Sequence, residues 1–217
     1  MTRASLTLSS KNYSSWSLRG WLLCRMAGLE FEEEMAPLDD PDVRAELLLL
    51  APSMRVPLLT HGDITVWDSL AIAEYLAEVK PKAGILPKDR AERAHCRAIS
   101  GEVHSGFQNL RSALPMNVKA RYEKFKIFTG ALPDIERIQG IWDDCFDRYG
   151  GPFLFRQPTL ADAMFAPVAT RFTTYDVTLT EASEAYRAHM MDWALMREWR
   201  AAAEAEPDEI EELEVEF

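Results

Sequence analysis

The sequence predicts an α/β domain followed by an all-α domain, and three observations lead to that prediction. Strand and helix signals alternate over the first eighty residues of this 217-residue chain. Residues 80–87, which are rich in proline and glycine, then interrupt the alternation. Beyond them apolar residues recur at helical spacing and strand signals are rare. We therefore expect an N-terminal domain at 1–80, a linker at 81–89 and a helical domain at 90–217.

The N-terminal domain contains four strand signals and three helix signals. The strand signals are short β-favouring runs, at 5–9, 30–35, 56–60 and 64–66. The last two flank a turn at Gly62 and predict a hairpin. Helices are expected at 14–27, from Asp39 into the leucine cluster at 47–50, and after Asp68. The resulting order, β-α-β-α-β-β-α, is that of a thioredoxin-like module.

The second half has the periodicity of a helical bundle. Its helix signals cover residues 90–114, 133–149, 159–174 and 185–203. We therefore expect a bundle of helices with little or no sheet.

Composition narrows the class of protein. Hydrophobic residues make up 47% and charged residues 27%, which allows a substantial core. No apolar run approaches the roughly 20 residues of a membrane span, and the N-terminus lacks a signal-peptide pattern, so a cytoplasmic location is expected. The three cysteines are widely spaced and the four histidines lack metal-ligand spacing, so neither disulfides nor a metal is expected.

The negative charge of the chain is concentrated at its end. The formal net charge is −11, and eight acidic residues without a lysine or arginine lie between Glu204 and Glu216. Such a tail repels phosphates and argues against nucleic-acid binding. We expect a solvated, partly disordered terminus, and a partner-binding element is the alternative.

Tyr13-Ser14-Ser15-Trp16-Ser17 is the first segment that could carry chemistry. A thiol reacts as its thiolate, and a hydroxyl donor at a helix N-terminus favours the anion. Ser14 and Ser15 are therefore candidate thiolate donors. The alternative is that Ser14 simply caps the helix.

Two further segments could bind a peptide-like ligand. Val56-Pro57 opens a strand, where a cis-proline would expose backbone groups for pairing and a trans-proline would only mark a sheet edge. Asp68-Ser69 opens a helix, where it could offer N–H groups and a hydroxyl to a carboxylate. An ordinary helix cap is the alternative for this pair.

Taken in order and spacing, these segments resemble the glutathione-binding half of the glutathione transferase family. The Ser-Ser-x-Ser string with Arg19 is most similar to the zeta class and its bacterial relatives. Thr159-Leu160-Ala161-Asp162, followed by residues 163–167, resembles the buried capping box of the same family. The resemblance therefore extends over nearly the whole chain.

The resemblance implies a role for each of these residues. Ser14, or otherwise Ser15, would donate to the sulfur of glutathione, while Thr159 and Asp162 would be structural. The remaining glutathione contacts would come from the backbone of Val56 next to a cis-Pro57 and from Asp68 and Ser69 at the γ-glutamyl end. Asp68 is shorter than the Glu or Gln that is usual there, and Trp16 stands where the zeta pattern has cysteine.

The resemblance also places a pocket for the electrophile between the two domains. Candidate lining residues are His104, Phe107, Gln108, Arg111 and Met116, for which core or surface positions are the alternative. Zeta isomerases are expected to hold a substrate carboxylate with an arginine at the position of Thr174. Arg171 lies about one helical turn earlier and is a possible substitute.

These implications favour a homodimeric glutathione transferase that adds glutathione to small electrophiles. A zeta-like glutathione-dependent isomerase and a non-catalytic module with the same fold are the alternatives. We exclude a thiol oxidoreductase, because the helix start lacks cysteine and Cys24 lies well inside the helix, as expected of a buried structural residue.

Overall fold

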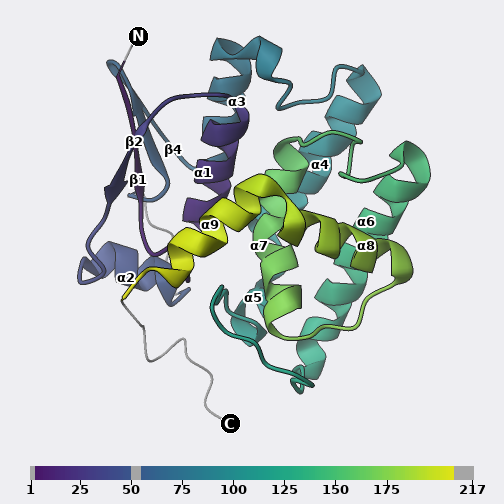
Figure 1. Ribbon diagram of the computed structural model, residues 1–217. Coiled ribbons are helices and arrows are strands. Elements are labelled where there is room, and N and C mark those ends of the chain that lie inside the picture. Colours follow the sequence, from purple (N-terminus) through teal and green to yellow (C-terminus); the bar gives the residue numbers. More distant parts are fainter. Residues whose placement is uncertain (1–2, 50–54, 208–217) are drawn as a thin grey trace.

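A computed structural model describes residues 3–49 and 55–207, which form an α/β part and a helical part (Figure 1). The α/β part contains the predicted order of elements. These elements are β1 (Ala4–Leu8), α1 (Ser15–Met26), β2 (Glu32–Met35), α2 (Pro41–Leu47), β3 (Leu58–His61), β4 (Ile64–Trp67) and α3 (Ser69–Val79).

The four strands form one mixed sheet in the order β2-β1-β3-β4. β1 pairs with β2 in parallel and with β3 in antiparallel orientation, and β3 and β4 form the predicted hairpin. β3 begins at Leu58 rather than at Val56, so Val56 and Pro57 precede the strand. The thioredoxin-like fold class of this part is confirmed.

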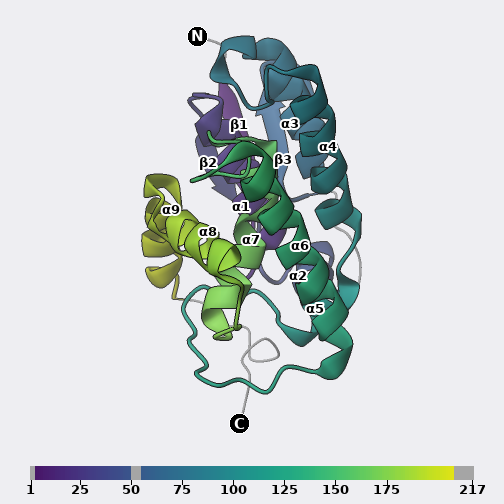
Figure 2. The same ribbon diagram turned by 90° about the vertical axis from the view of Figure 1, so that its right-hand side faces the viewer.

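The helical part contains six α-helices and a short 3-10 turn among its described residues, after a first 3-10 turn at Pro81–Ala83 in the linker. The elements are α4 (Arg90–Ser105), α5 (Gln108–Ala113), η2 (Thr129–Ala131), α6 (Leu132–Tyr149), α7 (Leu160–Thr174), α8 (Glu181–Asp192) and α9 (Ala194–Glu204). The bundle predicted for this half is confirmed (Figure 2).

Two helices predicted as continuous are each divided in the structure. The helix expected at 90–114 is broken after Ser105, because Phe107 has a left-handed φ of 62°. The helix expected at 185–203 begins earlier, at Glu181, and is divided at Trp193, whose ψ of 133° is extended. Apolar periodicity continues across both breaks, so periodicity alone predicted too few helices.

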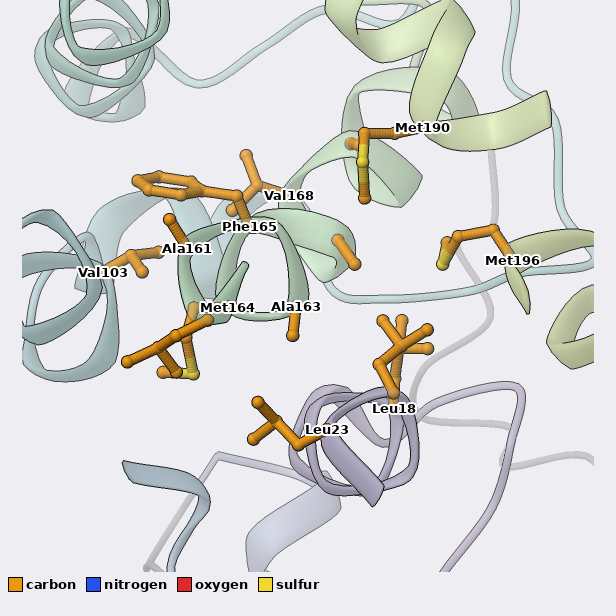
Figure 3. Packing of buried hydrophobic residues seen from close by; sticks show 14 of the residues in the cluster. Leu18, Leu23, Val103, Ala161, Ala163, Met164, Phe165, Val168, Met190 and Met196 are labelled. Atoms are coloured by element: carbon orange, nitrogen blue, oxygen red, sulfur yellow. The ribbon is translucent and has the colours of Figure 1, made fainter. Parts of the chain in front are cut away.

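Helix α7 is the central element of the core, and α1 lies between it and the sheet (Figure 1). Leu18 and Leu23 lie on the side of α1 that faces α7, and their side chains, like that of Met164 in α7, are fully buried (Figure 3). Nearly every residue of α7 is buried. The two parts therefore share one hydrophobic core, which holds the start of α1 in place against the helical part.

A buried capping box begins α7, as the sequence predicts. Asp162 Oδ2 accepts hydrogen bonds from the backbone N–H of Thr159 at 2.8 Å and from its hydroxyl at 3.0 Å. Asp162 Oδ1 accepts from the N–H of Leu154 at 3.0 Å and from the hydroxyl of Tyr186 at 3.1 Å. One fully buried carboxyl group thus joins α7 to the preceding loop and to α8.

We predict that Asp162→Ala lowers the free energy of unfolding by more than about 3 kcal/mol, because it leaves several buried donors without an acceptor. Asp89→Ala is the matched control, since Asp89 caps α4 at the surface and its loss should cost about 1 kcal/mol. Urea unfolding of both variants measures the difference. Equal losses would show that the buried carboxyl group of Asp162 stabilises the protein no more than the surface cap at Asp89 does.

Candidate active site

Ser14 lies at the start of α1 and has both of its hydrogen-bonding functions occupied. Its Oγ accepts the N–H of Ser17 at 3.2 Å, which caps the helix, and its hydroxyl donates to Glu46 Oε1 at 3.3 Å. The residue is fully buried. The capping role that the sequence left open is therefore present, and the hydroxyl hydrogen points to α2.

Ser15 is held differently, by a buried arginine of the helical part. Arg171 Nη2 donates to Ser15 Oγ at 2.8 Å, while Arg171 Nε donates to the carbonyl of Leu114 at 2.8 Å and Nη1 to that of Pro167 at 3.2 Å. Because Ser15 accepts this bond, its own hydrogen stays available for a ligand. Burial and the charge of Arg111 lower the pKa of Arg171 to about 9.

A cavity of about 10 Å³ lies beside Ser15. Its described lining residues come from the start of α1, from α2 and from the helical part: Tyr13, Ser15, Trp16, Glu46, Leu47, Leu49, Pro115, Met116 and Arg171. Met116 was predicted to line the electrophile pocket, and it lies here. The cavity brings a hydroxyl, a carboxyl and a guanidinium group together at a helix N-terminus.

Trp16 is surrounded by cationic and polar groups. The guanidinium carbons of Arg19 and Arg111 lie 4.6 and 5.3 Å from the centre of its ring, and the His104 ring packs edge-on at 5.0 Å. Both arginines are buried, and burial together with the charges of Arg111 and Arg171 lowers the pKa of Arg19. The site is therefore strongly positive beside an aromatic surface.

Asp68 joins the two parts of the protein. Its Oδ1 caps α3 by accepting the N–H groups of Leu70 and Ala71, and its Oδ2 lies 3.1 Å from His104 Nε2. Burial raises the pKa of Asp68. The hydrogen bonds from His104 and from the α3 backbone lower the pKa by more than burial raises it, so the net shift is downward. Asp68 also has a positive φ of 73°, a strained conformation typical of functional positions.

The segment before β3 has the geometry that the resemblance implies. The Val56-Pro57 peptide bond is cis, and Val56 is buried. Gly20 of α1 allows Pro57 to approach closely, because a Cβ atom at Gly20 would lie 2.5 Å from Pro57 Cβ. The neighbouring Ser69 hydroxyl is buried and makes no hydrogen bond within the described ranges 3–49 and 55–207.

The remaining predicted pocket residues separate into two groups. His104 and Arg111 meet at the ring of Trp16, and Arg111 also donates to the carbonyl of Val103 at 2.5 Å. Phe107 instead belongs to the hydrophobic core, and Gln108 is exposed and donates to the carbonyl of Ser105 at 3.3 Å. The structure thus places Phe107 and Gln108 away from the cavity.

Glu206 is a site-supporting residue that sequence reasoning missed. Its carboxylate accepts from the Ser10 hydroxyl at 2.8 Å, from Lys11 N–H at 2.6 Å and from Asn12 N–H at 3.1 Å, and so holds the loop before Ser14. The expectation of a solvated acidic tail is therefore wrong for Glu206, while residues 208–217 of that tail lie outside the described part. A run of acidic residues gives no signal that one of them binds a loop near the other end of the chain.

The cysteines of the protein lie away from the surface. Cys24, Cys96 and Cys145 are buried free thiols, and burial raises the pKa of Cys24 to about 12. No cluster of metal-ligating side chains occurs among the described residues. Nor is any described helix both long and apolar enough to cross a bilayer.

Residues 13–79 match the sequence model of the glutathione S-transferase N-terminal domain. This segment belongs to that family. It includes the start of α1, the cis-proline and Asp68-Ser69, and so covers the three segments on which the resemblance was first based.

Curated relatives carry glutathione-related names. The chain is 35% identical over 98 residues to a probable maleylacetoacetate isomerase of Caenorhabditis elegans, covering 45% of each chain. It is 35% identical over 113 residues to glutathione S-transferase 1 of Dianthus caryophyllus, covering 52% of this chain and 51% of that one. The chain thus spans about half the length of these relatives.

Solved glutathione transferases share the fold over most of their length. A Burkholderia homologue with bound glutathione superposes with a TM-score of 0.68 at 22% identity, covering 94% of this chain and 99% of that one. A maleylacetoacetate isomerase from Anaeromyxobacter dehalogenans with bound glutathione gives 0.67 at 23% identity, covering 96% and 99%. The α/β part and the helical bundle are therefore arranged as in glutathione transferases.

We predict that Glu206→Ala releases the loop before Ser14. The N–H of Lys11 has Glu206 as its acceptor, so its hydrogen exchange should accelerate at least about tenfold, given the roughly 1.5–3 kcal/mol of a hydrogen bond to a charged group. Asn12, whose N–H also contacts Ser10 Oγ, should respond less. Glu204→Ala, an exposed change at the end of α9, is the control, and equal exchange in both variants would contradict the role of Glu206.

Proposed function

We propose that this protein is a glutathione transferase that adds glutathione to small electrophiles, with Ser15 as the thiolate donor. The observation that carries this proposal is the hydrogen bond from Arg171 to Ser15 Oγ beside a cavity at the start of α1. A cationic donor polarises the hydroxyl, which makes its hydrogen a better donor to a thiolate. The N-terminus of α1 favours the same anion.

The choice between the two serines follows from their partners. The hydroxyl hydrogen of Ser14 is directed to Glu46 and its oxygen caps the helix. Ser15 has its hydrogen available and lines the cavity. We therefore assign the sulfur contact to Ser15 and a supporting role to Ser14, which reverses the order of preference suggested by the sequence.

The rest of glutathione would lie along the α/β part. The backbone of Val56 beside cis-Pro57 would pair with the cysteinyl unit, and Asp68 with Ser69 would bind the γ-glutamyl end. The Ser69 hydroxyl supports this assignment because a buried hydroxyl without a partner in the described chain gains a hydrogen bond when a ligand binds. His104 would keep the Asp68 carboxylate charged and correctly oriented for the γ-glutamyl ammonium group.

A glutathione-dependent isomerase is the second candidate. Several relatives are named maleylacetoacetate isomerase, including one from mouse that is 34% identical over 133 residues, or 57% of this chain and 60% of that one. Arg171 occupies the cavity beside Ser15, where a guanidinium group could hold a substrate carboxylate. Turnover of maleylacetoacetate with catalytic amounts of glutathione would favour this candidate, whereas stoichiometric consumption of glutathione by an electrophile would favour conjugation.

A homodimer and a cytoplasmic location complete the proposal. Light scattering at low micromolar concentration tests the dimer. Calorimetric titration with glutathione tests the site itself, because a non-catalytic module that had lost the site would bind no glutathione.

We predict that Ser15→Ala raises the pKa of the bound glutathione thiol by about one to two units. Loss of a hydrogen bond to a charged group costs about 1.5–3 kcal/mol, and one pKa unit corresponds to about 1.4 kcal/mol. The ultraviolet absorbance of the thiolate, followed against pH in the protein–glutathione complex, measures this shift.

Ser14→Ala is the matched control for that measurement. It should lower stability by about 1 kcal/mol through loss of the helix cap and should shift the thiol pKa by less than half as much. A larger thiol shift in Ser14→Ala than in Ser15→Ala would reverse the assignment of the two serines.

A further inference from the structure

Glu46, in the last turn of α2, is a buried carboxyl group that the proposed function does not yet use. Only 4% of the residue is exposed to solvent. Its Oε1 accepts the hydroxyl of Ser14, while its Oε2 is buried and has no hydrogen-bond partner within residues 3–49 and 55–207. Glu46 also lines the cavity beside Ser15.

The surroundings of Glu46 favour the neutral acid over the carboxylate. Burial and the hydrogen bond from Ser14 are the influences on its pKa, with no contribution from a described cation. Arg171, which lines the same cavity, donates to Ser15, Leu114 and Pro167. An unpaired buried carboxylate is very costly, so such a group takes up a proton instead. Consistent with this, burial raises the pKa of Glu46 to about 8.

In a neutral carboxylic acid at this position, one oxygen can accept the hydrogen bond from Ser14 while the other carries the proton and donates. Oε1 remains an acceptor for Ser14, and the proton resides on Oε2, the oxygen without a partner. An O–H group there is a donor for an atom in the cavity. A carboxylic acid kept neutral by burial is a known way to stabilise a developing anion.

We propose that Glu46 is a neutral acid that donates a hydrogen bond from Oε2 to the glutathione sulfur, as a second thiolate donor opposite Ser15. This inference rests on the proposed function of the site. No proton is transferred in this role: the thiol proton leaves to solvent, and the thiolate is then held between the two O–H groups. Glu46 would thus be a catalytic residue contributed by α2, whereas the sequence motifs indicate thiolate donors only at the start of α1.

The proposal gives the site a particular dependence on pH. As pH rises through the pKa of Glu46, the Oε2 proton is lost, and a negative charge replaces a donor beside the sulfur. The other titratable side chains that line the cavity are Tyr13, from the loop before α1, and Arg171, from α7. Arg171 remains cationic while Glu46 ionises, because a guanidinium group keeps its proton in proteins. The bound thiolate fraction still rises with pH, but the affinity for glutathione should fall at pH values above the pKa values of both Glu46 and the free thiol, because a carboxylate then faces the thiolate.

Two substitutions in the full-length protein separate the parts of this proposal. In Glu46→Gln the amide oxygen still accepts from Ser14 and the amide nitrogen still donates, but the group does not ionise. In Glu46→Met the side chain has a similar length and no donor. The thiolate absorbance of both variants is followed against pH at saturating glutathione, and their affinity for glutathione is measured by calorimetry over the same pH range.

We expect Glu46→Gln to keep the thiol pKa within about half a unit of the wild type and to reduce the alkaline fall in glutathione affinity. We expect Glu46→Met to raise the thiol pKa, with about tenfold less thiolate at pH values below it. A wild-type thiol pKa in Glu46→Met, or an alkaline fall in glutathione affinity that is as steep in Glu46→Gln as in the wild type, would overturn the proposal.

A direct titration keeps the proposal testable even if Glu46→Met fails to fold. The Glu46 carboxyl carbon, assigned by comparison with Glu46→Gln, is followed by carbon-13 NMR in the glutathione-free protein. A midpoint near 8 supports the neutral acid, and a midpoint near the ordinary 4.5 overturns it. Failure of the wild type to bind glutathione in calorimetry would instead overturn the proposed function, so the two failures are distinguishable.

Discussion

The hydrogen bond from Arg171 to Ser15 is the contact on which the arrangement of the site depends. It joins residues 156 positions apart and is made entirely within the core. Arg171 can reach Ser15 because α7 packs directly against α1, and α7 is fixed at its start by the Asp162 capping box. The Asp162 capping box, the packing of α7 against α1 and the position of Ser15 are therefore linked through the hydrophobic core.

An excess of buried positive charge distinguishes this core from an ordinary one. Arg19, Arg111 and Arg171 are all buried, the charge of Arg111 lowers the pKa of the other two, and Asp68 and Asp134 offset only part of this charge. Backbone carbonyl groups and the Trp16 ring compensate part of the desolvation, for example through the 3.0 Å bond from Arg19 to Met164 O. Sites with this excess of positive charge favour anionic ligands, which is consistent with a thiolate bearing a glutamyl carboxylate.

Local signals explain which parts of the fold could be predicted from the sequence. The caps at Ser14 and Asp68 and the box at Thr159 all act within a few residues, and each predicted a real helix start. The breaks at Phe107 and Trp193 were missed because they depend on backbone angles that apolar spacing does not encode.

The site was predictable to a lesser degree, for a related reason. Sequence patterns selected Ser15, Asp68 and His104, but the partners that define their chemistry are remote in the chain. Glu46 is separated from Ser14 by 32 residues, and Glu206 from Lys11 by 195. Burial and pairing over such separations arise only in the folded chain. Local sequence patterns therefore could not predict the hydrogen-bond partners of Glu46 and Glu206.

The contact between Glu206 and the loop at Ser10 to Asn12 has a consequence for the order in which the protein matures during synthesis. Because the acceptor lies just after the last helix, the loop gains its final hydrogen bonds only when nearly all of the chain has left the ribosome. The α/β part can form its sheet early, since its strands come from the first 67 residues. The nascent protein would thus hold a folded sheet next to an incompletely ordered loop before Ser14 until Glu206 has left the ribosome.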